Sequence, residues 1–504
     1  MAVSTQYMFL RALLALAAGV LAPLSLAPFD FWYLAPLSVA LCFFTLQGTT
    51  SRAAMLLGWC FGLGFYGVGI SWVYISMHEH GNASVLLAGF LTALFVAALA
   101  LLMALQCWLY RRWLYNVFGF VALWVVFEWL RSWLLTGFPW LFLGYSLLDT
   151  PLAVYAPFGG VWLLSFYVVL CGALTITVFK RLNHPLQALS LLALILIPWG
   201  GADKVPADWT INSGKDLQVM LVQANIPQQA KWQRDQLPGI LEQYSKLSQD
   251  SEEVDLLIWP ETAIPTFYRN ALEDLNPLLQ QLEQQNTAMI SGIPSVFRDN
   301  TKPRNTGYYN SLTIFSGGNG SYHKQRLVPF GEYVPLESLL RGLIDFFNLP
   351  MSSFSLGPVE QQLLQVNGVK IAPYICYEIA YPELVRESSL ESNLLLTVSN
   401  DTWFGHSIAP AQHLQIARMR ALETGRWLIR STNNGITALV SPEGKITATI
   451  PQFETAVLRG TVSLMEGQTP YQQYGLEPFK ITLGAMLFFA FLTRPRRRKA
   501  YKTI

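Results

Sequence analysis

One cysteine stands apart among the residues of this chain that could do chemistry. Four of the five cysteines lie inside apolar runs long enough to cross a bilayer, whereas Cys376 lies in the long polar stretch of the sequence. An unpaired thiol there cannot form a structural disulfide, and it cannot build a zinc site without a cluster of histidines or carboxylates nearby. Cys376 is therefore either a nucleophile or a small buried apolar side chain, which is what most free cysteines are.

A carboxylate and an amine occur where they could activate this thiol. Glu261 follows an apolar run and Pro260, so it should stand just beyond a strand end, where sites lie in open α/β sheets. Lys324 lies in a polar segment, and Cys376 directly follows the apolar run 371–375. A thiol needs a base to become a nucleophile at neutral pH, and the oxyanion that its attack creates needs a fixed positive charge or N–H donors. Glutamate, lysine and cysteine supply these roles, although each residue taken singly is more often solvated or part of a core.

Short strands and helices must position these residues. Apolar runs typical of strands alternate with polar helical patterns over 236–250 and 410–424. The strand-like runs are 217–224, 256–259, 289–293, 312–315, 371–375 and 394–398. Several of them are apolar at consecutive positions, as expected for strands that are covered on both faces. The pattern predicts an α/β sandwich.

The rest of the chain has the composition of a membrane protein. Of its 504 residues, 52% are hydrophobic and only 13% are charged, and the mean hydropathy is +0.33. The net charge of +2 and the lack of a basic stripe interleaved with aromatic residues give no support to nucleic-acid binding, so we expect no nucleic-acid partner. A spanning helix needs about 20 apolar residues. The sequence predicts eight spans, near 9–27, 31–47, 54–76, 83–109, 116–134, 158–178, 186–200 and 478–493.

These patterns divide the chain into four parts. A bundle of seven transmembrane helices is predicted over 1–200, followed by a linker over 201–215. The soluble domain follows over 216–470, and 471–504 hold the eighth helix and a basic tail. Lys and Arg concentrate in alternate loops and in that tail. The positive-inside rule therefore predicts that both termini are cytoplasmic and that the soluble domain lies on the other side of the membrane.

Three motifs carry a resemblance to a known family. They are Trp259-Pro260-Glu261, Lys324 ahead of the segment 327–332 (Leu-Val-Pro-Phe-Gly-Glu), and Cys376-Tyr377-Glu378. With the predicted spans and the segment 431–437, they make the chain resemble, over essentially its whole length, the bacterial apolipoprotein N-acyltransferases, a membrane-bound branch of the nitrilase superfamily. The resemblance implies a nitrilase-like αββα sandwich inserted between transmembrane helices 7 and 8 of an eight-helix bundle. It also implies a multi-pass protein of the bacterial inner membrane with a periplasmic catalytic domain.

The reaction of that family is acyl transfer between lipids. The resemblance implies that an acyl chain leaves a phospholipid donor, usually phosphatidylethanolamine, and reaches the N-terminal amine of a diacylglyceryl-cysteine apolipoprotein. The product is a mature triacylated lipoprotein. Cys376 would attack the acyl ester and hold the chain as a thioester, Glu261 would be the general base, and Lys324 would stabilise the oxyanion. The Lys324 ammonium would also favour the thiolate while Glu261 accepts its proton.

Further residues are implied by the same resemblance. Glu332 matches an additional essential glutamate that would orient the lysine or the base, and stiffening of its loop is the alternative. Tyr377 and Glu378 match positions that line a substrate entrance. The substrate-binding candidates are Trp232, Trp140, Trp403 and Phe404. The first two could equally be anchors at the headgroup level, and the last two could form either a lid that dips into lipid or part of the core.

Two alternatives stay open from the residues alone. The same triad would suit a membrane-anchored amidase, because hydrolysis and acyl transfer use the same three groups. A transporter or lipid-binding protein is the other, although the spans lack the intramembrane charge pairs of ion coupling, apart from an interfacial pair of Glu128 and Arg131. Neither His78-Glu79-His80 nor His406 with His413 has the spacing of a zinc hydrolase, so we expect no metal and no organic cofactor.

Overall fold

The computed structural model describes residues 5–81, 83–299, 306–329, 331–333 and 354–494. Two features of the sequence analysis lie outside these ranges, namely Phe330 of the lysine motif and the basic tail beyond residue 494. The chain forms two compact units. A helical unit comprises 1–71, 90–205 and 476–504, and a sandwich unit comprises 72–89 and 206–475.

A helix lies over each of the eight ranges for which the sequence predicts a membrane span. These helices are α1 (Thr5–Leu21), α2 (Leu34–Leu46), α3 (Ser51–Gly69), α5 (Val85–Leu109), α6 (Val117–Arg131), α7 (Ala156–Lys180), α8 (Pro185–Gly201) and α16 (Glu477–Leu492). Among the described residues, four stretches are long and apolar enough to cross a membrane, or five if the bent pair Ser51–Gly69 and Val73–His80 is one span. With 15 and 16 residues, α6 and α16 are shorter than the roughly 20 residues that a bilayer requires. The number of eight spans therefore stays a prediction.

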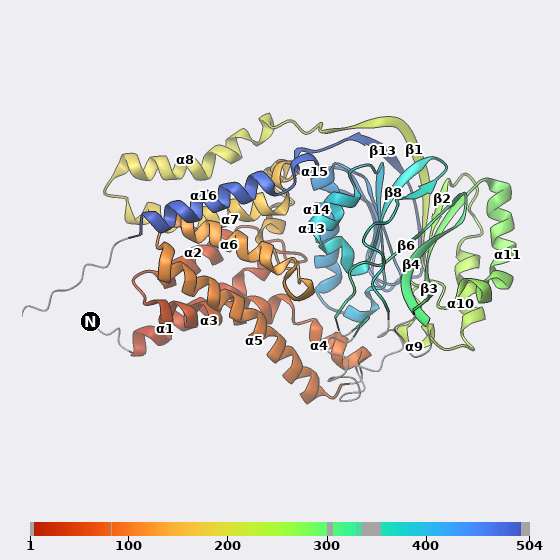
Figure 1. The fold of residues 1–504 in the computed structure, drawn as a ribbon, viewed down its shortest axis with the longest axis horizontal. Coiled ribbons are helices and arrows are strands. Elements are labelled where there is room, and N and C mark those ends of the chain that lie inside the picture. The colour runs from red at the N-terminus through yellow and green to blue at the C-terminus, as the bar shows by residue number, and fades with distance from the viewer. Residues whose placement is uncertain (1–4, 82, 300–305, 330, 334–353, 495–504) are drawn as a thin grey trace, which may run out of the picture. The chain divides into compact units, whose positions relative to one another are not determined.

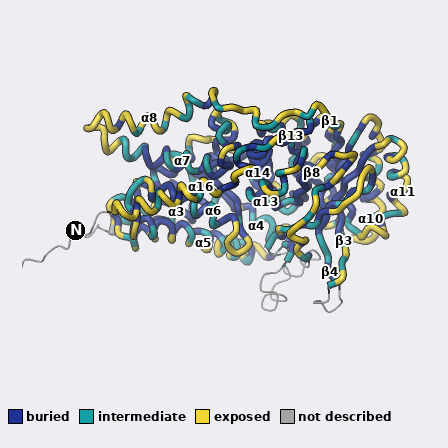
Figure 2. The backbone as a smooth tube through the Cα atoms, turned by 45° about the horizontal axis from the view of Figure 1, so that its top comes forward, coloured by how far each residue is buried: buried dark blue, intermediate teal, exposed yellow. Residues whose placement is uncertain are grey.

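Small residues let helices of the first unit approach closely. A Cβ atom added to Gly19 would lie 2.0 Å from the Phe61 carbonyl oxygen, and one added to Gly64 would lie 2.2 Å from that of Leu16. At both places the backbones of α1 and α3 approach so closely that only glycine fits. Close approach at small residues is typical of helices that pack in lipid. Figure 2 shows α8 as largely exposed, and its apolar side chains include Leu186, which is 80% exposed. Exposed apolar side chains on a helix of this kind are expected where lipid covers them.

The sandwich unit contains two sheets that pack face to face (Figure 1). The first has the order β13-β1-β2-β3-β4-β6, from β1 (Thr210–Gln223), β2 (Leu256–Ile258), β3 (Ala288–Arg298), β4 (Thr306–Ser316), β6 (Ser321–His323) and β13 (Ala456–Gly467). The second has the order β12-β11-β10-β9-β8-β7-β5, from β5 (Gly318–Asn319), β7 (Leu364–Val366), β8 (Val369–Ile375), β9 (Leu394–Ser399), β10 (Leu428–Thr432), β11 (Thr437–Val440) and β12 (Ile446–Ile450). Strands β1, β2 and β3 run parallel to one another, as do β8, β9 and β10.

Alternating side chains explain the layers of this unit. In β2, Leu256 and Ile258 enter the core between the sheets, whereas Leu257 packs against α10 (Leu237–Leu247) and α11 (Tyr268–Gln285). In β9, Leu394 enters the same intersheet core, and Leu395 faces α14 (Ala409–Thr424). Strands with apolar residues on both faces thus lie between helices, with α10 and α11 outside one sheet and α13 (Pro382–Ser388) and α14 outside the other (Figure 1). This is an αββα sandwich, and it agrees with the class predicted from the apolar runs.

Two boundaries differ from the sequence prediction. Strand β1 begins at Thr210, inside the linker predicted over 201–215, because this part of the chain pairs with β13. Residues 72–89, predicted to belong to the bundle, belong to the sandwich unit. In that unit, Ser76 Oγ donates a hydrogen bond to the Trp403 carbonyl oxygen over 2.7 Å.

Candidate active site

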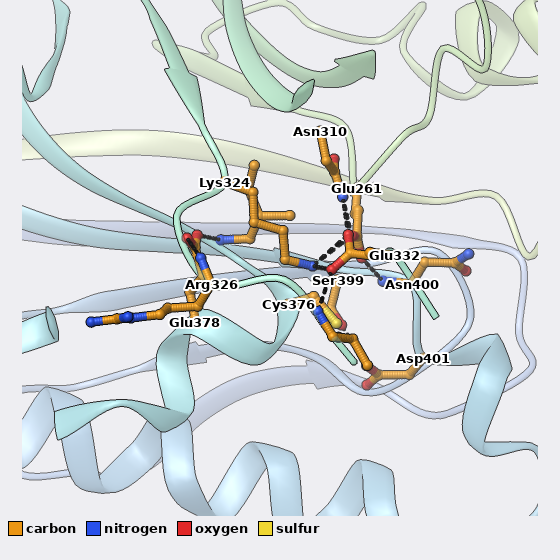
Figure 3. A network of polar contacts seen from close by, with 12 residues as sticks. Glu261, Asn310, Lys324, Arg326, Glu332, Cys376, Glu378, Ser399, Asn400 and Asp401 are labelled. Carbon is orange, nitrogen blue, oxygen red and sulfur yellow. Dashed lines mark hydrogen bonds and ion pairs between the residues drawn. The ribbon is translucent and has the colours of Figure 1, made fainter. Parts of the chain in front are cut away.

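The sandwich collects polar residues where its strands end. Glu261 lies three residues beyond β2, Cys376 directly follows β8, and Lys324 directly follows β6. The segment 399–401 begins at the last residue of β9. Figure 3 shows that the side chains of Glu261, Lys324 and Cys376 come together. The ends of strands from both sheets therefore meet at one site, as is common in α/β proteins.

Charges of opposite sign are paired around Lys324. Its Nζ lies 2.8 Å from Glu332 Oε2 and 3.5 Å from Glu261 Oε1, and the lysine is only 1% exposed. Asn310 Nδ2 donates to Glu261 Oε1 over 2.8 Å and to Glu332 Oε1 over 2.9 Å, so it links the two carboxylates. Burial alone would lower the pKa of Lys324, but Glu332 and Glu261 together raise that pKa above its ordinary value. Lys324 is therefore a fixed cation at neutral pH.

A second set of donors holds Glu261. The Asn400 N–H donates to Glu261 Oε2 over 2.8 Å, and Lys231 Nζ donates to the Glu261 main-chain carbonyl oxygen over 2.9 Å. Burial lowers the pKa of Lys231 to about 8, although Glu261 and Cys376 oppose that shift. With donors on both carboxylate oxygens, Glu261 keeps one orientation.

The nucleophile candidate Cys376 has an unusual backbone. Its φ angle is +54°, in the left-handed region that residues other than glycine rarely adopt. The pKa of its thiol is raised above the ordinary value, first by burial and then by the Glu261 carboxylate, while Lys324 and a hydrogen bond with Ser399 oppose the rise. Lys324 lowers the pKa of the thiol, as the sequence analysis expects, but burial raises that pKa by more. The thiol is thus protonated at rest, and a base has to remove the proton during the attack.

Glu378 braces the site through several hydrogen bonds. Its carboxylate is buried: Oε2 accepts from the Ile375 N–H over 2.8 Å, and Oε1 accepts from the Arg326 N–H over 3.1 Å, the Tyr322 hydroxyl over 3.0 Å and the Gln325 N–H. Burial raises its pKa to about 7, against the opposing effect of these donors. The bonds tie the turn after β8 to the segment after β6. These contacts give Glu378 a structural role, and the entrance position expected for it stays a prediction.

Aromatic side chains gather beside the lysine motif. Trp232 and Trp403 pack in one apolar cluster, whose other members are Leu327, Phe354, Tyr308 and Tyr333. The Phe404 ring makes an edge contact with the Trp72 ring at 4.9 Å between centroids, and Tyr377, which is 9% exposed, makes one with Tyr381 at 5.2 Å. These packed positions give each ring a structural role, and the substrate-binding role of the four expected aromatics stays a prediction.

Trp140 lies in the helical unit and is buried there. It is only 1% exposed, and its carbonyl oxygen accepts a hydrogen bond from Arg131 Nη1 over 3.1 Å. The nearby pair of Arg131 Nη2 and Glu128 Oε1, 3.9 Å apart, is buried as well. A headgroup anchor would have an exposed ring, so the burial of Trp140 gives no support to that alternative. The interfacial position of the Glu128–Arg131 pair stays a prediction.

Several polar residues of the site escaped the sequence analysis. Asn400 and Asp401 had a signal, because they follow the apolar run 394–398 just as Glu261 follows its own run. Asn310 lies inside β4, where no sequence pattern marks a functional side chain, and His413, which the sequence analysis considered only as a metal ligand, lies inside α14. Within the described ranges, no group of three or more His, Cys, Asp or Glu side chains could hold a metal ion.

Two family models match the chain. The model described as the apolipoprotein N-acyltransferase N-terminal domain matches residues 18–174, and the model described as carbon-nitrogen hydrolase matches residues 218–470. The first match lies in the predicted bundle. The second spans the sandwich from β1 to β13 and includes the three predicted catalytic residues.

Relatives match the chain over nearly its whole length. An apolipoprotein N-acyltransferase from Pseudomonas paraeruginosa is 48% identical over 500 residues, which cover 97% of this chain and 98% of the relative. One from Azotobacter vinelandii is 49% identical over 499 residues, with 97% and 96% covered. Among solved structures, a carbon-nitrogen hydrolase from Helicobacter pylori has 15% identity and a TM-score of 0.36 over 57% of this chain and 97% of its own. A Saccharomyces cerevisiae member of the nitrilase superfamily has 15% identity and a TM-score of 0.37 over 56% and 97%.

Proposed function

Because the chain belongs to the apolipoprotein N-acyltransferase family, we propose that Cys376, Glu261 and Lys324 carry out that family's reaction in this protein. The protein is an acyltransferase that acylates the N-terminus of a lipoprotein, and a phospholipid is the acyl donor. One observation carries the assignment of the residues. A thiol, a carboxylate and a fixed ammonium converge where strands from both sheets end (Figure 3).

The first half of the reaction loads the enzyme. Cys376 Sγ attacks the carbonyl carbon of a phospholipid acyl ester, and its proton passes to Glu261. The ester oxygen becomes an oxyanion, which the Lys324 ammonium stabilises. When the tetrahedral intermediate collapses, the bond between the carbonyl carbon and the glycerol oxygen breaks, and Glu261 gives its proton to that oxygen. A lysophospholipid leaves, and the acyl chain remains on Cys376 as a thioester.

The second half transfers the chain to the lipoprotein. The neutral amine of the diacylglyceryl-cysteine attacks the thioester carbonyl carbon, and Glu261 accepts a proton from the nitrogen. The carbon–nitrogen bond forms, the carbon–sulfur bond breaks, and the proton on Glu261 returns to the sulfur of Cys376. Glu332 and Asn310 support both halves, since their bonds to Lys324 and Glu261 keep the cation and the base in place.

We extend the proposal to the membrane. Phosphatidylethanolamine is the proposed donor, the sandwich unit faces the periplasm, and both termini lie in the cytoplasm at the bacterial inner membrane. The alternation of basic loops along the sequence supports this orientation. Moving an acyl chain into water costs about 0.8 kcal/mol per CH₂. A reaction at the membrane surface avoids this cost, because the chain can stay in an apolar environment, and excluded water cannot hydrolyse the thioester.

The test is the acyl enzyme itself. Purified protein is incubated with phosphatidylethanolamine labelled in its acyl chain, and the adduct is located by peptide mass spectrometry. We expect a hydroxylamine-sensitive adduct on Cys376 that is lost in Cys376→Ala. The matched control is Cys60→Ala, which removes another free and partly exposed thiol and should keep the adduct.

The fate of the adduct separates the alternatives. Discharge to a diacylglyceryl-peptide amine supports the acyltransferase assignment of Cys376. Discharge to water alone, with the amine present, favours an amidase-like hydrolase. An adduct on another residue, or none at all, would overturn the assigned nucleophile.

A further inference from the structure

A buried polar network reaches the main-chain carbonyl of Cys376. His413 Nε2 lies 3.1 Å from the Cys376 carbonyl oxygen. Arg430 Nη2 lies 3.2 Å from His413 Nδ1 and 2.6 Å from Asp401 Oδ2. His413, Asp401 and Arg430 are at most 2% exposed. None of the three has a role in the reaction proposed above.

The partners of His413 fix which of its nitrogens carries the proton. A carbonyl oxygen can only accept a hydrogen bond, so Nε2 must be the donor to Cys376. Burial and the nearby Arg430 lower the pKa of His413, which keeps the ring neutral, so Nδ1 is unprotonated and accepts from Arg430. Asp401 Oδ1 lies 3.3 Å from the same nitrogen, and the ion pair with Arg430 balances the charge of that carboxylate.

The bond from His413 falls on a residue that needs support. Cys376 has a φ angle of +54°, and a cysteine in this conformation stays there only when its surroundings hold it. We propose that His413, fixed by Arg430 and Asp401, is a positioning residue that holds the Cys376 carbonyl and so aims the thiol at Glu261 and Lys324. The proposal rests on the proposed role of Cys376 as nucleophile. It adds that the nucleophile depends on a group that never meets the acyl chain.

The consecutive residues 399–401 connect this support to the base. Ser399 Oγ shares a hydrogen bond with the Cys376 thiol, which it can only accept because its own O–H donates to Asp401 Oδ1. The Asn400 N–H donates to Glu261 Oε2 over 2.8 Å. Asp401 then holds Arg430, which holds His413. One turn after β9 therefore sets the relative positions of the nucleophile and the base.

The test compares two amides at position 413 in the full-length enzyme. The amide nitrogen of glutamine reaches the place of histidine Nε2, whereas that of the shorter asparagine does not. The single-turnover rate of adduct formation with labelled phosphatidylethanolamine is measured for His413→Gln, His413→Asn and wild type. We expect His413→Gln to stay within about fivefold of wild type, and His413→Asn to be about 100-fold slower, since small misplacements of reacting groups cost that much.

The amplitude of the reaction separates positioning from folding. A purely structural role would reduce the amount of active protein and leave the rate of the active fraction unchanged, and that result overturns the proposal. Equal rates in His413→Gln and His413→Asn overturn it as well. His413→Leu, which removes the donor altogether, replaces His413→Asn if the asparagine variant does not fold. Failure of wild type to form any adduct on Cys376 would instead overturn the proposed function, and this inference with it.

Discussion

Two buried carboxylates, Glu261 and Glu378, act on the same segment of the chain in different ways. Glu261 lies 3.5 Å from the side-chain ammonium of Lys324, whereas Glu378 accepts hydrogen bonds from the backbone N–H groups of Gln325 and Arg326. The first contact places a cation beside a group that exchanges a proton with Cys376 in the proposed reaction. The second fixes the backbone from which the lysine extends. Both glutamates follow strand ends, so the surrounding donors, and not the position in the sequence, distinguish the reacting acid from the bracing one.

Glu261→Gln should have the largest effect on the reaction. A neutral amide cannot take the thiol proton, so the rate of acylation of Cys376 should fall about 10²–10⁴-fold. The fold should survive, because Asn310 Oδ1 has no hydrogen-bond partner among the described residues and can turn toward the new amide nitrogen, at the cost of the Asn310 bond to Glu332. Rapid-quench measurement of the labelled thioester gives the rate, and the melting temperature in detergent reports the fold. Acylation within tenfold of wild type would contradict the assignment of Glu261 as the base.

Glu378→Gln should show the opposite balance, with a larger loss of stability and a smaller loss of rate. The Glu378 oxygens face three backbone N–H groups that cannot turn away, so an amide nitrogen in either position meets a donor. An unsatisfied buried group of this kind costs about 1–3 kcal/mol. The melting temperature of Glu378→Gln should therefore fall below that of Glu261→Gln. Equal melting temperatures would mean that the two carboxylates are not distinguished as we argue.

The sequence predicts the strands that carry this site better than the polar contacts within it. Apolar runs predict the strands, and the residues just beyond them include Glu261 and Cys376, because such positions depend on local pattern. Asn310 carries no such local signal, and the position of Asn400 after an apolar run does not reveal its partner. Both residues bond Glu261, which lies 49 and 139 residues away, and only the folded sheets bring them together. The bracing role of Glu378 escapes for the same reason, since its acceptor bonds to the segment after β6 span more than 50 residues.

The pH dependence of stability should sharpen the comparison further. Burial raises the pKa of Glu378 from 4.5 to about 7, so between these values the folded state binds more protons than the unfolded state. The contribution of Glu378 to stability is therefore full below about pH 4.5 and is lost as the pH rises to about 7. A protonated carboxyl still accepts hydrogen bonds through its lone pairs, which an amide nitrogen cannot do. The difference in melting temperature between wild type and Glu378→Gln should thus be larger at pH 5 than at pH 8, and a difference that grows with pH would refute this cause.

Lys231→Met should have the smallest effect on the acylation rate. It tests whether Glu261 stays in place without the contact from Lys231. Lys231 contacts the main-chain oxygen of Glu261 and not its carboxylate. Burial lowers the pKa of Lys231 to about 8, so the folded state carries the cost of its charge below that pH, and stability rises as the pH passes from about 8 toward 10.5. Methionine avoids this cost. It also removes the donor to the Glu261 carbonyl oxygen, so the melting temperature of the variant should stay close to that of wild type at pH 7, and the rise above pH 8 should be lost. Its acylation rate should fall less than tenfold, because Asn310 and Asn400 still hold the carboxylate. A loss as large as that in Glu261→Gln would instead mean that the Lys231 amine takes part in the proton transfer, and Glu261 would then not be the sole base.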